Sequence, residues 1–423
     1  MKNCTSLLVL IVLFILSLQV SPAQGVWTSQ TSGVSTELTA VKAVGSTVAW
    51  VGGTNGVVLR TADAGSTWAS VGGGAIGTSR INSIAATSDS IALVATTPST
   101  TTYIFRTTNA GASWTQAYSL DGGFINAIWM INPAIGFAVG DPVGGKFVVV
   151  KTTDGGLNWT RLSNEPSANA NEYGLAGSLS IRDGSYIWFG TNNGRVIFST
   201  DQGATWTSAT TPLRDVNSVW FNSSSQGFVA GLKSDNTPAC AQSSDGGSTW
   251  QATTGSTFRS VGDGYQRYYA FESSIIYVRQ DFNSPWTFAY GATNILNDIS
   301  IGYAGFTSFG WAVGKNGTIA QLQEVITKVI DISQQPNNYY LEQNFPNPFN
   351  PSTRISYKVP VPSHVRIIVF NILGQKVATL IDGKTNSGKY AVTFNGSNLS
   401  TGLYIYKFEA NNHFESKKML LLR

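Results

Sequence analysis

Short stretches in which hydrophobic and polar residues alternate follow one another along most of the chain, separated by residues that favour turns. In one unit these stretches are 124–130, 136–139, 146–152 and 159–162, and Asn-Pro, Gly-Asp-Pro and Asp-Gly-Gly sequences lie between them. Signals for helices are missing. The pattern therefore predicts an all-β chain with four short strands per unit.

A short phrase, Ser/Thr-x-Asp-x-Gly-x-Thr-Trp with small changes, occurs five times. The tryptophans that end the copies are 44 to 47 residues apart. Units of this length with four strands are typical of β-propeller blades, which bury their faces only against neighbouring blades. The five tryptophans are Trp68, Trp114, Trp159, Trp206 and Trp250.

Two weaker units, 256–289 and 293–323, extend the repeat. The last unit lacks an outer strand, and 26–29 resembles the strand that follows the phrase in the other units. We therefore predict a seven-bladed propeller over 25–323, in which the N-terminal strand completes the last blade. Such closure would leave no exposed sheet edge between the two ends of the ring.

The residues after the propeller form a different pattern. A polar linker is predicted at 324–339, and three prolines within 346–351 predict an extended strap that cannot join a regular sheet. Six alternating strands follow, at 354–359, 365–372, 376–381, 390–394, 403–409 and 414–422. We expect 340–423 to be a small Ig-like β-sandwich.

The N-terminal 24 residues have a charged start, an apolar run from Leu7 to Leu18 and small residues near Ala23. This pattern predicts a secretory signal peptide cleaved near Ala23 or Gln24, because the run is too short to span a bilayer. No other segment is apolar enough for a membrane span. After cleavage Cys240 would be the only cysteine, which excludes a disulfide within the chain, and we expect an inert buried thiol.

The charge distribution excludes several classes of function. Residues 25–323 carry about 15 Lys and Arg against about 17 acidic residues, so the body is nearly neutral and no nucleic-acid partner is expected. Both histidines, His364 and His413, lie in the tail, so the propeller has no histidine for a catalytic triad or a zinc site. No cofactor or metal is expected. The protein is expected to be a monomer.

The repeated phrase is a turn in which a side-chain oxygen accepts backbone N–H groups, glycine supplies a permissive φ, and tryptophan packs between blades. It resembles the Asp-box, or BNR repeat, and the longer repeat resembles the seven-bladed photosystem II assembly-factor type of propeller. A catalytic or calcium-binding role is the alternative to a structural one, but an asparagine in one copy favours the structural role. The residues concerned are Asp63, Asn109, Asp154, Asp201 and Asp245.

Polar and aromatic residues at or just before the first strand of several blades are expected to ring one mouth of the axial channel. Their composition favours contact with a protein or a glycan, although each could equally be a solvated rim residue. The candidates are Arg80, Phe124, Tyr173, Arg214, Asp215 and Arg259. A glycoside hydrolase that uses carboxylates such as Asp121, Glu165, Glu172 or Asp215 is the competing hypothesis, and a structural spacer is a third.

Several motifs in the tail occur in a definite order: Asn-Phe-Pro-Asn-Pro-Phe-Asn-Pro at 344–351, Asn-Ile-Leu-Gly at 371–374, Gly-Leu-Tyr-Ile-Tyr at 402–406 and a basic end at 417–423. In these motifs 340–423 closely resembles the type A C-terminal sorting domain of the bacterial type IX secretion system. The resemblance implies transport across the outer membrane, with this machinery as a partner and the cell surface or the medium as destination. An ordinary adhesion-type sandwich is the alternative.

Overall fold

The computed structural model describes residues 25–253, 260–264, 267–280, 284–304, 307–323, 339–411 and 413–422. The predicted signal peptide, nearly all of the predicted linker and Arg259 lie outside these residues. The described chain consists of strands and three short 3-10 turns, at Thr54–Gly56, Gly74–Ile76 and Lys315–Gly317. Among the described residues no helix is long and apolar enough to cross a membrane.

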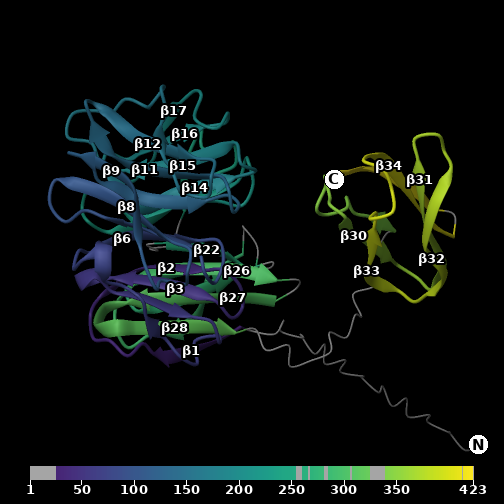
Figure 1. The fold of residues 1–423 in the computed structure, drawn as a ribbon, viewed down its shortest axis with the longest axis horizontal. Coiled ribbons are helices and arrows are strands. Elements are labelled where there is room, and N and C mark those ends of the chain that lie inside the picture. Colours follow the sequence, from purple (N-terminus) through teal and green to yellow (C-terminus); the bar gives the residue numbers. More distant parts are fainter. Residues whose placement is uncertain are drawn as a thin grey trace, which may run out of the picture. The chain divides into compact units, whose positions relative to one another are not determined.

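Seven four-stranded antiparallel sheets follow one another between Val26 and Gln323, and they form the blades of a propeller (Figure 1). The prediction of an all-β, seven-bladed architecture is therefore confirmed. Blades 1 to 6 are each built from four consecutive strands, and blade 7 combines three C-terminal strands with the first strand of the chain.

The strands of blades 1 to 4 are β2 (Leu38–Ala43), β3 (Ala49–Gly53), β4 (Val58–Thr61), β5 (Ala69–Ser70); β6 (Ile81–Ala86), β7 (Ala92–Thr96), β8 (Thr101–Thr107), β9 (Thr115–Asp121); β10 (Ile125–Met130), β11 (Gly136–Val143), β12 (Lys146–Thr152), β13 (Thr160–Arg161); β14 (Gly174–Arg182), β15 (Tyr186–Thr191), β16 (Arg195–Ser199) and β17 (Thr207–Thr210). Those of blades 5 to 7 are β18 (Asp215–Phe221), β19 (Gly227–Leu232), β20 (Pro238–Ser243), β21 (Gln251–Ala252); β22 (Ser260–Gly264), β23 (Arg267–Glu272), β24 (Ile275–Arg279), β25 (Thr287–Gly291); β26 (Leu296–Ala304), β27 (Thr307–Gly314), β28 (Thr318–Gln323) and β1 (Val26–Thr31).

The N-terminal strand closes the ring as predicted. β1 pairs with β28 in an antiparallel register that runs from Val26 opposite Gln323 to Thr31 opposite Thr318 (Figure 1). Gln30 also donates to the carbonyl of Ala64 in blade 1 at 3.1 Å. Blade 7 is thus tied to its neighbour through the first strand of the chain.

Adjacent blades share their hydrophobic cores. Trp50 of blade 1 is fully buried with Ile84 and Val94 of blade 2, and Trp114 meets the Trp50 ring edge-on at a centroid distance of 6.2 Å. The middle strand β3 is buried along its whole length, because both of its faces lie against other blades. This explains why the middle strands are continuously apolar while the outermost strands are exposed.

The tail forms a second unit with two sheets around one core (Figure 1). One sheet has the order β29-β30-β33 and the other β32-β31-β34-β35. The proline-rich strap makes only isolated bridges, from Phe345 to Arg354 and from Phe349 to Leu421, in agreement with its predicted irregularity. The strands are β29 (Tyr340–Leu341), β30 (Ser352–Val359), β31 (Ser363–Asn371), β32 (Lys376–Thr385), β33 (Gly388–Asn395), β34 (Gly402–Ala410) and β35 (His413–Leu421).

Candidate binding face and axial channel

The repeated phrase forms the turn between the third and fourth strands of blades 1 to 5. In the first copy, Oδ1 of Asp63 accepts the Thr67 N–H at 2.9 Å and the Thr61 hydroxyl at 2.8 Å, and Oδ2 accepts the Thr67 hydroxyl at 2.6 Å. The hydrogen bonds from Thr67 and Thr61 lower the pKa of Asp63 to about 2. Both carboxylate oxygens therefore accept hydrogen bonds within their own turn.

The asparagine copy has the same architecture. Oδ1 of Asn109 accepts the Ser113 N–H at 3.0 Å and the Thr107 hydroxyl at 2.9 Å, while its amide donates to the Ser113 hydroxyl at 2.9 Å. The turn therefore needs an acceptor and not a negative charge. Among the described residues no group of three or more His, Cys, Asp or Glu side chains could hold a metal ion.

The tryptophans of the phrase lie at the junctions between blades. Nε1 of Trp114 donates to the carbonyl of Val71, at the end of blade 1, at 2.8 Å. Nε1 of Trp68 donates to Oε1 of Gln30, in the closing strand, at 3.2 Å. Each of these rings thus links its own blade to the blade before it.

The loops that lead into the first strands carry the candidate binding residues. Because the strands of a blade are antiparallel, these loops and the phrase turns lie at opposite ends of the blade. Arg80, Phe124, Tyr173 and Arg214 each stand directly before a first strand, and Asp215 begins one. The structure thus places these five at one face of the ring, which we call the loop face, while Arg259 lies outside the described residues.

Polar contacts fix the two arginines of the loop face without burying them. Arg214 forms an ion pair with Asp215 and donates to Oδ1 of Asn236 at 2.7 Å. Arg80 lies 3.5 Å from Glu37, which also accepts the Asn297 amide at 3.0 Å. The arginine side chains are 39% and 54% exposed, respectively, so their remaining donors can meet a ligand.

Tyr173 is also available on this face, because 48% of its surface is exposed. Its backbone N–H donates to Oδ1 of Asn192 at 2.8 Å, which fixes the loop, and its ring is near enough to Arg214 to interact electrostatically. Phe124 is half-buried. Tyr173 and Arg214 therefore offer an aromatic surface and a cation on the same face of the ring.

Two of the carboxylates considered for glycoside hydrolysis, Glu165 and Glu172, are held by arginines. Glu165 accepts two hydrogen bonds from Arg161, at 3.0 and 2.5 Å, and the Val149 N–H at 2.9 Å. Glu172 is held in the same way by Arg195, at 2.9 and 2.5 Å. Both glutamates are buried. Neither is free to donate a proton to a glycosidic oxygen or to attack a sugar.

One carboxyl group of the loop face was missed by the sequence analysis. Oδ1 of Asp141 accepts the Asn126 amide at 2.8 Å and the Gly174 N–H at 2.9 Å, so it joins blades 3 and 4. Burial raises its pKa, against the effect of these hydrogen bonds. Its only sequence signal is the Gly-Asp-Pro sequence. In the structure, the pairing register of β11 with β12 shifts at this sequence, between Gly140 and Pro142.

A charged and aromatic cluster inside the ring was also missed. The Lys42 ammonium of blade 1 lies 5.5 Å from the centre of the Trp129 ring in blade 3, and Lys42 interacts electrostatically with Asp298 and Arg182. These residues belong to the first strands of blades 7, 1, 3 and 4. Contacts across non-adjacent blades place them in the axial channel.

The pH dependence of stability should report on this cluster. Burial raises the pKa of Asp298 to about 7, although its carboxylate accepts the Val41 N–H at 2.8 Å and lies near Lys42. Ionisation therefore disfavours the folded state, and stability should fall by up to about 4 kcal/mol between pH 4 and pH 7 from this group. We expect Asp298→Asn to flatten this slope in urea denaturation across that range, and an unchanged slope would contradict this assignment.

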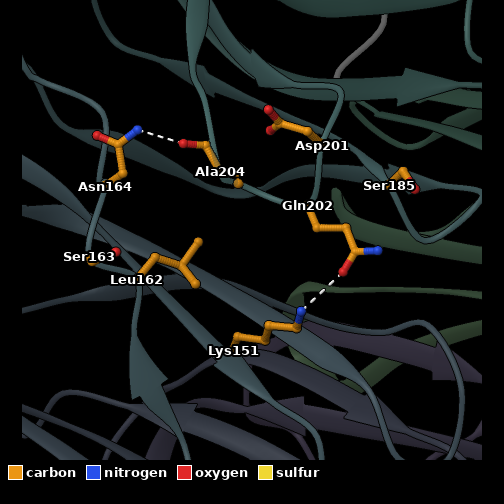
Figure 2. A pocket seen from close by; sticks show the side chains of 9 residues that line it. Lys151, Leu162, Ser163, Asn164, Ser185, Asp201, Gln202 and Ala204 are labelled. Atoms are coloured by element: carbon orange, nitrogen blue, oxygen red, sulfur yellow. Dashed lines mark hydrogen bonds between the residues drawn. The ribbon is translucent and has the colours of Figure 1, made fainter.

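A groove of about 510 Å³ lies on the opposite face, between blades 3 and 4. Figure 2 shows two hydrogen bonds that join the blades across this groove: Nζ of Lys151 donates to Oε1 of Gln202 at 3.1 Å, and the Asn164 amide donates to the Ala204 carbonyl at 2.6 Å. No aromatic residue lines it. We therefore assign its polar groups to the junction between the blades.

Comparison with known proteins decides the nature of the tail. Residues 343–422 match the family described as the secretion system C-terminal sorting domain. The tail is a sorting domain. The protein is therefore exported by type IX secretion and is either displayed at the cell surface or released.

Solved structures resemble the propeller in fold. A structure described as YCF48 bound to D1 peptide has a TM-score of 0.51 and 15% identity, over 70% of this chain and 96% of its own. The extracellular domain of the putative hybrid two-component system BT3049 from B. thetaiotaomicron has a TM-score of 0.50 and 12% identity, over 94% of this chain and 57% of its own. The WD40 propeller domain of Doa1 has a TM-score of 0.50 and 10% identity, over 71% of this chain and 97% of its own. No curated protein matches the sequence.

The strap of the sorting domain is anchored by buried polar groups. The Tyr406 hydroxyl accepts the Asn344 N–H at 2.8 Å and donates to the Glu342 carbonyl at 2.8 Å. The Asn344 amide donates to the Thr353 hydroxyl at 2.9 Å. Burial raises the pKa of Tyr406 to about 12, so this anchor stays protonated at any physiological pH. The asparagine that opens the first tail motif thus fixes the strap on the sandwich.

Proposed function

We propose that the propeller is a non-catalytic binding module for a protein or a glycan, and that the sorting domain delivers it to the cell surface. The observation that carries this proposal is the combination of Arg80, Tyr173 and Arg214 on the loop face. All three are anchored by neighbours and still exposed. Anchored cations and an exposed aromatic ring lose little conformational entropy on binding, which favours affinity.

A hydrolase is less well supported. Glu165 and Glu172 are held by arginines, and the propeller sequence contains no histidine. Asp121, Asp141, with its raised pKa, and Asp215 are the carboxyl groups through which such an activity would have to act. The raised pKa of Asp141 has a structural explanation, because the same burial places it between two blades.

A peptide is the ligand class that we favour. The similar propeller described as YCF48 bound to D1 peptide binds a peptide, and its likeness to this chain extends over 70% of the residues. At 15% identity this likeness concerns the fold, so the argument for a peptide depends on the exposed cations and the tyrosine of the loop face. An acidic segment of another protein would complement them.

The mature full-length protein should be tested on peptide and glycan arrays, with an assay for released reducing ends in parallel. We expect saturable binding that Arg214→Ala and Tyr173→Ala each weaken about tenfold, as residues at the centre of an interface do. Leu157→Ala is the matched control, because Leu157 is 56% exposed in a phrase turn on the other face.

Two results would contradict the proposal. Binding that survives both substitutions on the loop face would place the ligand elsewhere. Release of sugar that is abolished by Asp121→Asn, Asp141→Asn or Asp215→Asn would instead identify a glycoside hydrolase.

A further inference from the structure

The outer face of the four-stranded sheet in the sorting domain has two unlike ends. In β31, Val365, Ile367 and Val369 are buried in the core, so the residues between them face outward. At one end the outward residues make polar contacts: Nε2 of His364 lies 2.7 Å from a carboxylate oxygen of Asp382, and Lys407 of β34 forms an ion pair with Glu409 at 2.8 Å. This end is an ordinary solvated surface.

The other end of the same face is apolar. Phe370 of β31 pairs with Ile405 of β34, and Leu403 of β34 pairs with Leu420 of β35. All four are outward positions, since their strand neighbours Val369, Tyr404 and Met419 are buried. Just beyond them, the turn between β31 and β32 carries Ile372 and Leu373. The residues that we call the apolar rim are Phe370, Ile372, Leu373, Leu403, Ile405 and Leu420.

The most exposed part of the apolar rim is held rigidly. Ile372 is 70% exposed and Leu373 is 77% exposed. Oδ1 of Asn371 accepts the N–H groups of Leu373 and Gln375, both at 3.0 Å, and its amide donates to the Gln375 side chain at 2.8 Å. Gly374 completes the turn with a φ of 77°. The turn therefore presents two large aliphatic side chains to water where polar residues are usual.

We propose that the apolar rim is the surface by which the export machinery holds the sorting domain. Residues 343–422 match a sorting domain, and a folded domain is recognised through the groups exposed on its surface. A rigid apolar patch on a face whose other end carries ion pairs has the character of an interaction surface. This inference rests on the sorting-domain match and is independent of the ligand proposed for the propeller.

Charge defines the partner further. Lys376, at the start of β32, and Lys418, opposite Ile405, are exposed beside the apolar rim. Neither forms an ion pair within the described part of the chain. The partner surface in the export machinery should therefore be an apolar groove bordered by acidic groups.

The test is export of the full chain from a bacterium that has type IX secretion. We expect the triple change Ile372→Ser, Leu373→Ser and Leu403→Ser to lower the exported fraction at least tenfold, the factor that corresponds to about 1.4 kcal/mol of binding. Phe414→Ser is the matched control, since Phe414 is 61% exposed at the charged end of the same sheet, opposite Glu409. It should be exported like the unaltered protein.

Stability must be measured on the same variants. Thermal unfolding of the purified full chain should be unchanged by the triple change, and the conservative pair Ile372→Met and Leu373→Met should retain export. Normal export of the triple variant would overturn the proposal. A lowered unfolding temperature together with lost export would also overturn it, because lost packing within the sorting domain would then explain the loss of export.

Discussion

Replacement of Glu172 by alanine should lower the free energy of unfolding of the propeller by about 3–5 kcal/mol, the effect expected when one partner of a buried ion pair is removed. The Glu172 side chain has no exposed surface, and that of Arg195 is 17% exposed. The carboxylate also accepts the Thr191 hydroxyl at 2.7 Å and the Asn169 N–H at 2.8 Å. Its loss removes the anionic partner of the Arg195 guanidinium, which keeps only the Ser208 hydroxyl and the Ser167 carbonyl among the contacts described, and leaves two further donors without this acceptor.

The pH dependence of the free energy of unfolding provides a second test of the Glu172–Arg195 ion pair. Burial alone would raise the pKa of Glu172, but the hydrogen bonds from Arg195, Asn169 and Thr191 bring it below 4.5. The folded-state pKa is therefore depressed, so the stabilisation is complete above about pH 4.5 and is lost as the pH falls through the folded value.

Urea denaturation followed by tryptophan fluorescence would measure the change. Asp121→Ala is the control, because Asp121 is exposed and bonded only to the Thr101 hydroxyl, at 2.6 Å, among the contacts described. Its effect should stay within about 0.5 kcal/mol. A loss below about 1 kcal/mol for Glu172→Ala would mean that water reaches the ion pair.

Replacement of Trp27 by alanine should have an effect of similar size, about 3–5 kcal/mol. Trp27 is 5% exposed in the closing strand β1 and packs against Tyr269 of blade 6 at a centroid distance of 5.9 Å. The change would remove the main apolar anchor of β1 and weaken its pairing with β28.

Thermal unfolding and limited proteolysis should both detect the weaker pairing of β1 with β28. We expect a lower unfolding temperature and faster cleavage within β1 for Trp27→Ala. Val26→Ala, in the same strand but at a residue that is 50% exposed, should behave like the unaltered protein. Equal protease resistance of the two variants would show that closure of the ring does not depend on the tryptophan.

The architecture could be predicted because its determinants are local and repeated. The phrase ending in tryptophan marks one turn in each of five blades. The similarity of 26–29 to the outer strands of the other blades identified the closing strand. The outward and inward positions of the tail strands follow from simple alternation. The short β29 was missed, since two residues carry no pattern.

The candidate sites were harder to predict because they depend on contacts between distant segments. Glu165 and Glu172 looked like available acids, yet each meets an arginine, and only the fold brings Arg195 to Glu172. Lys42, Arg182 and Asp298 come from three different blades, and nothing in their local sequence indicates the channel. Asp141 lies in a turn sequence whose irregular geometry emerges only when β11 pairs with β12.

The pairing of Val26 with Gln323 also constrains the order of folding. Contacts between the two ends of a long chain form slowly, because the entropy of closing the loop must be overcome before they stabilise anything. The first six blades can assemble from neighbouring strands, whereas blade 7 stays incomplete until β1 pairs with β28. Until then the edge of β28 is open to strands of other molecules. The competition between ring closure and aggregation is therefore decided at the pairing of β1 with β28. A chaperone that bound either strand would protect the whole propeller from aggregation.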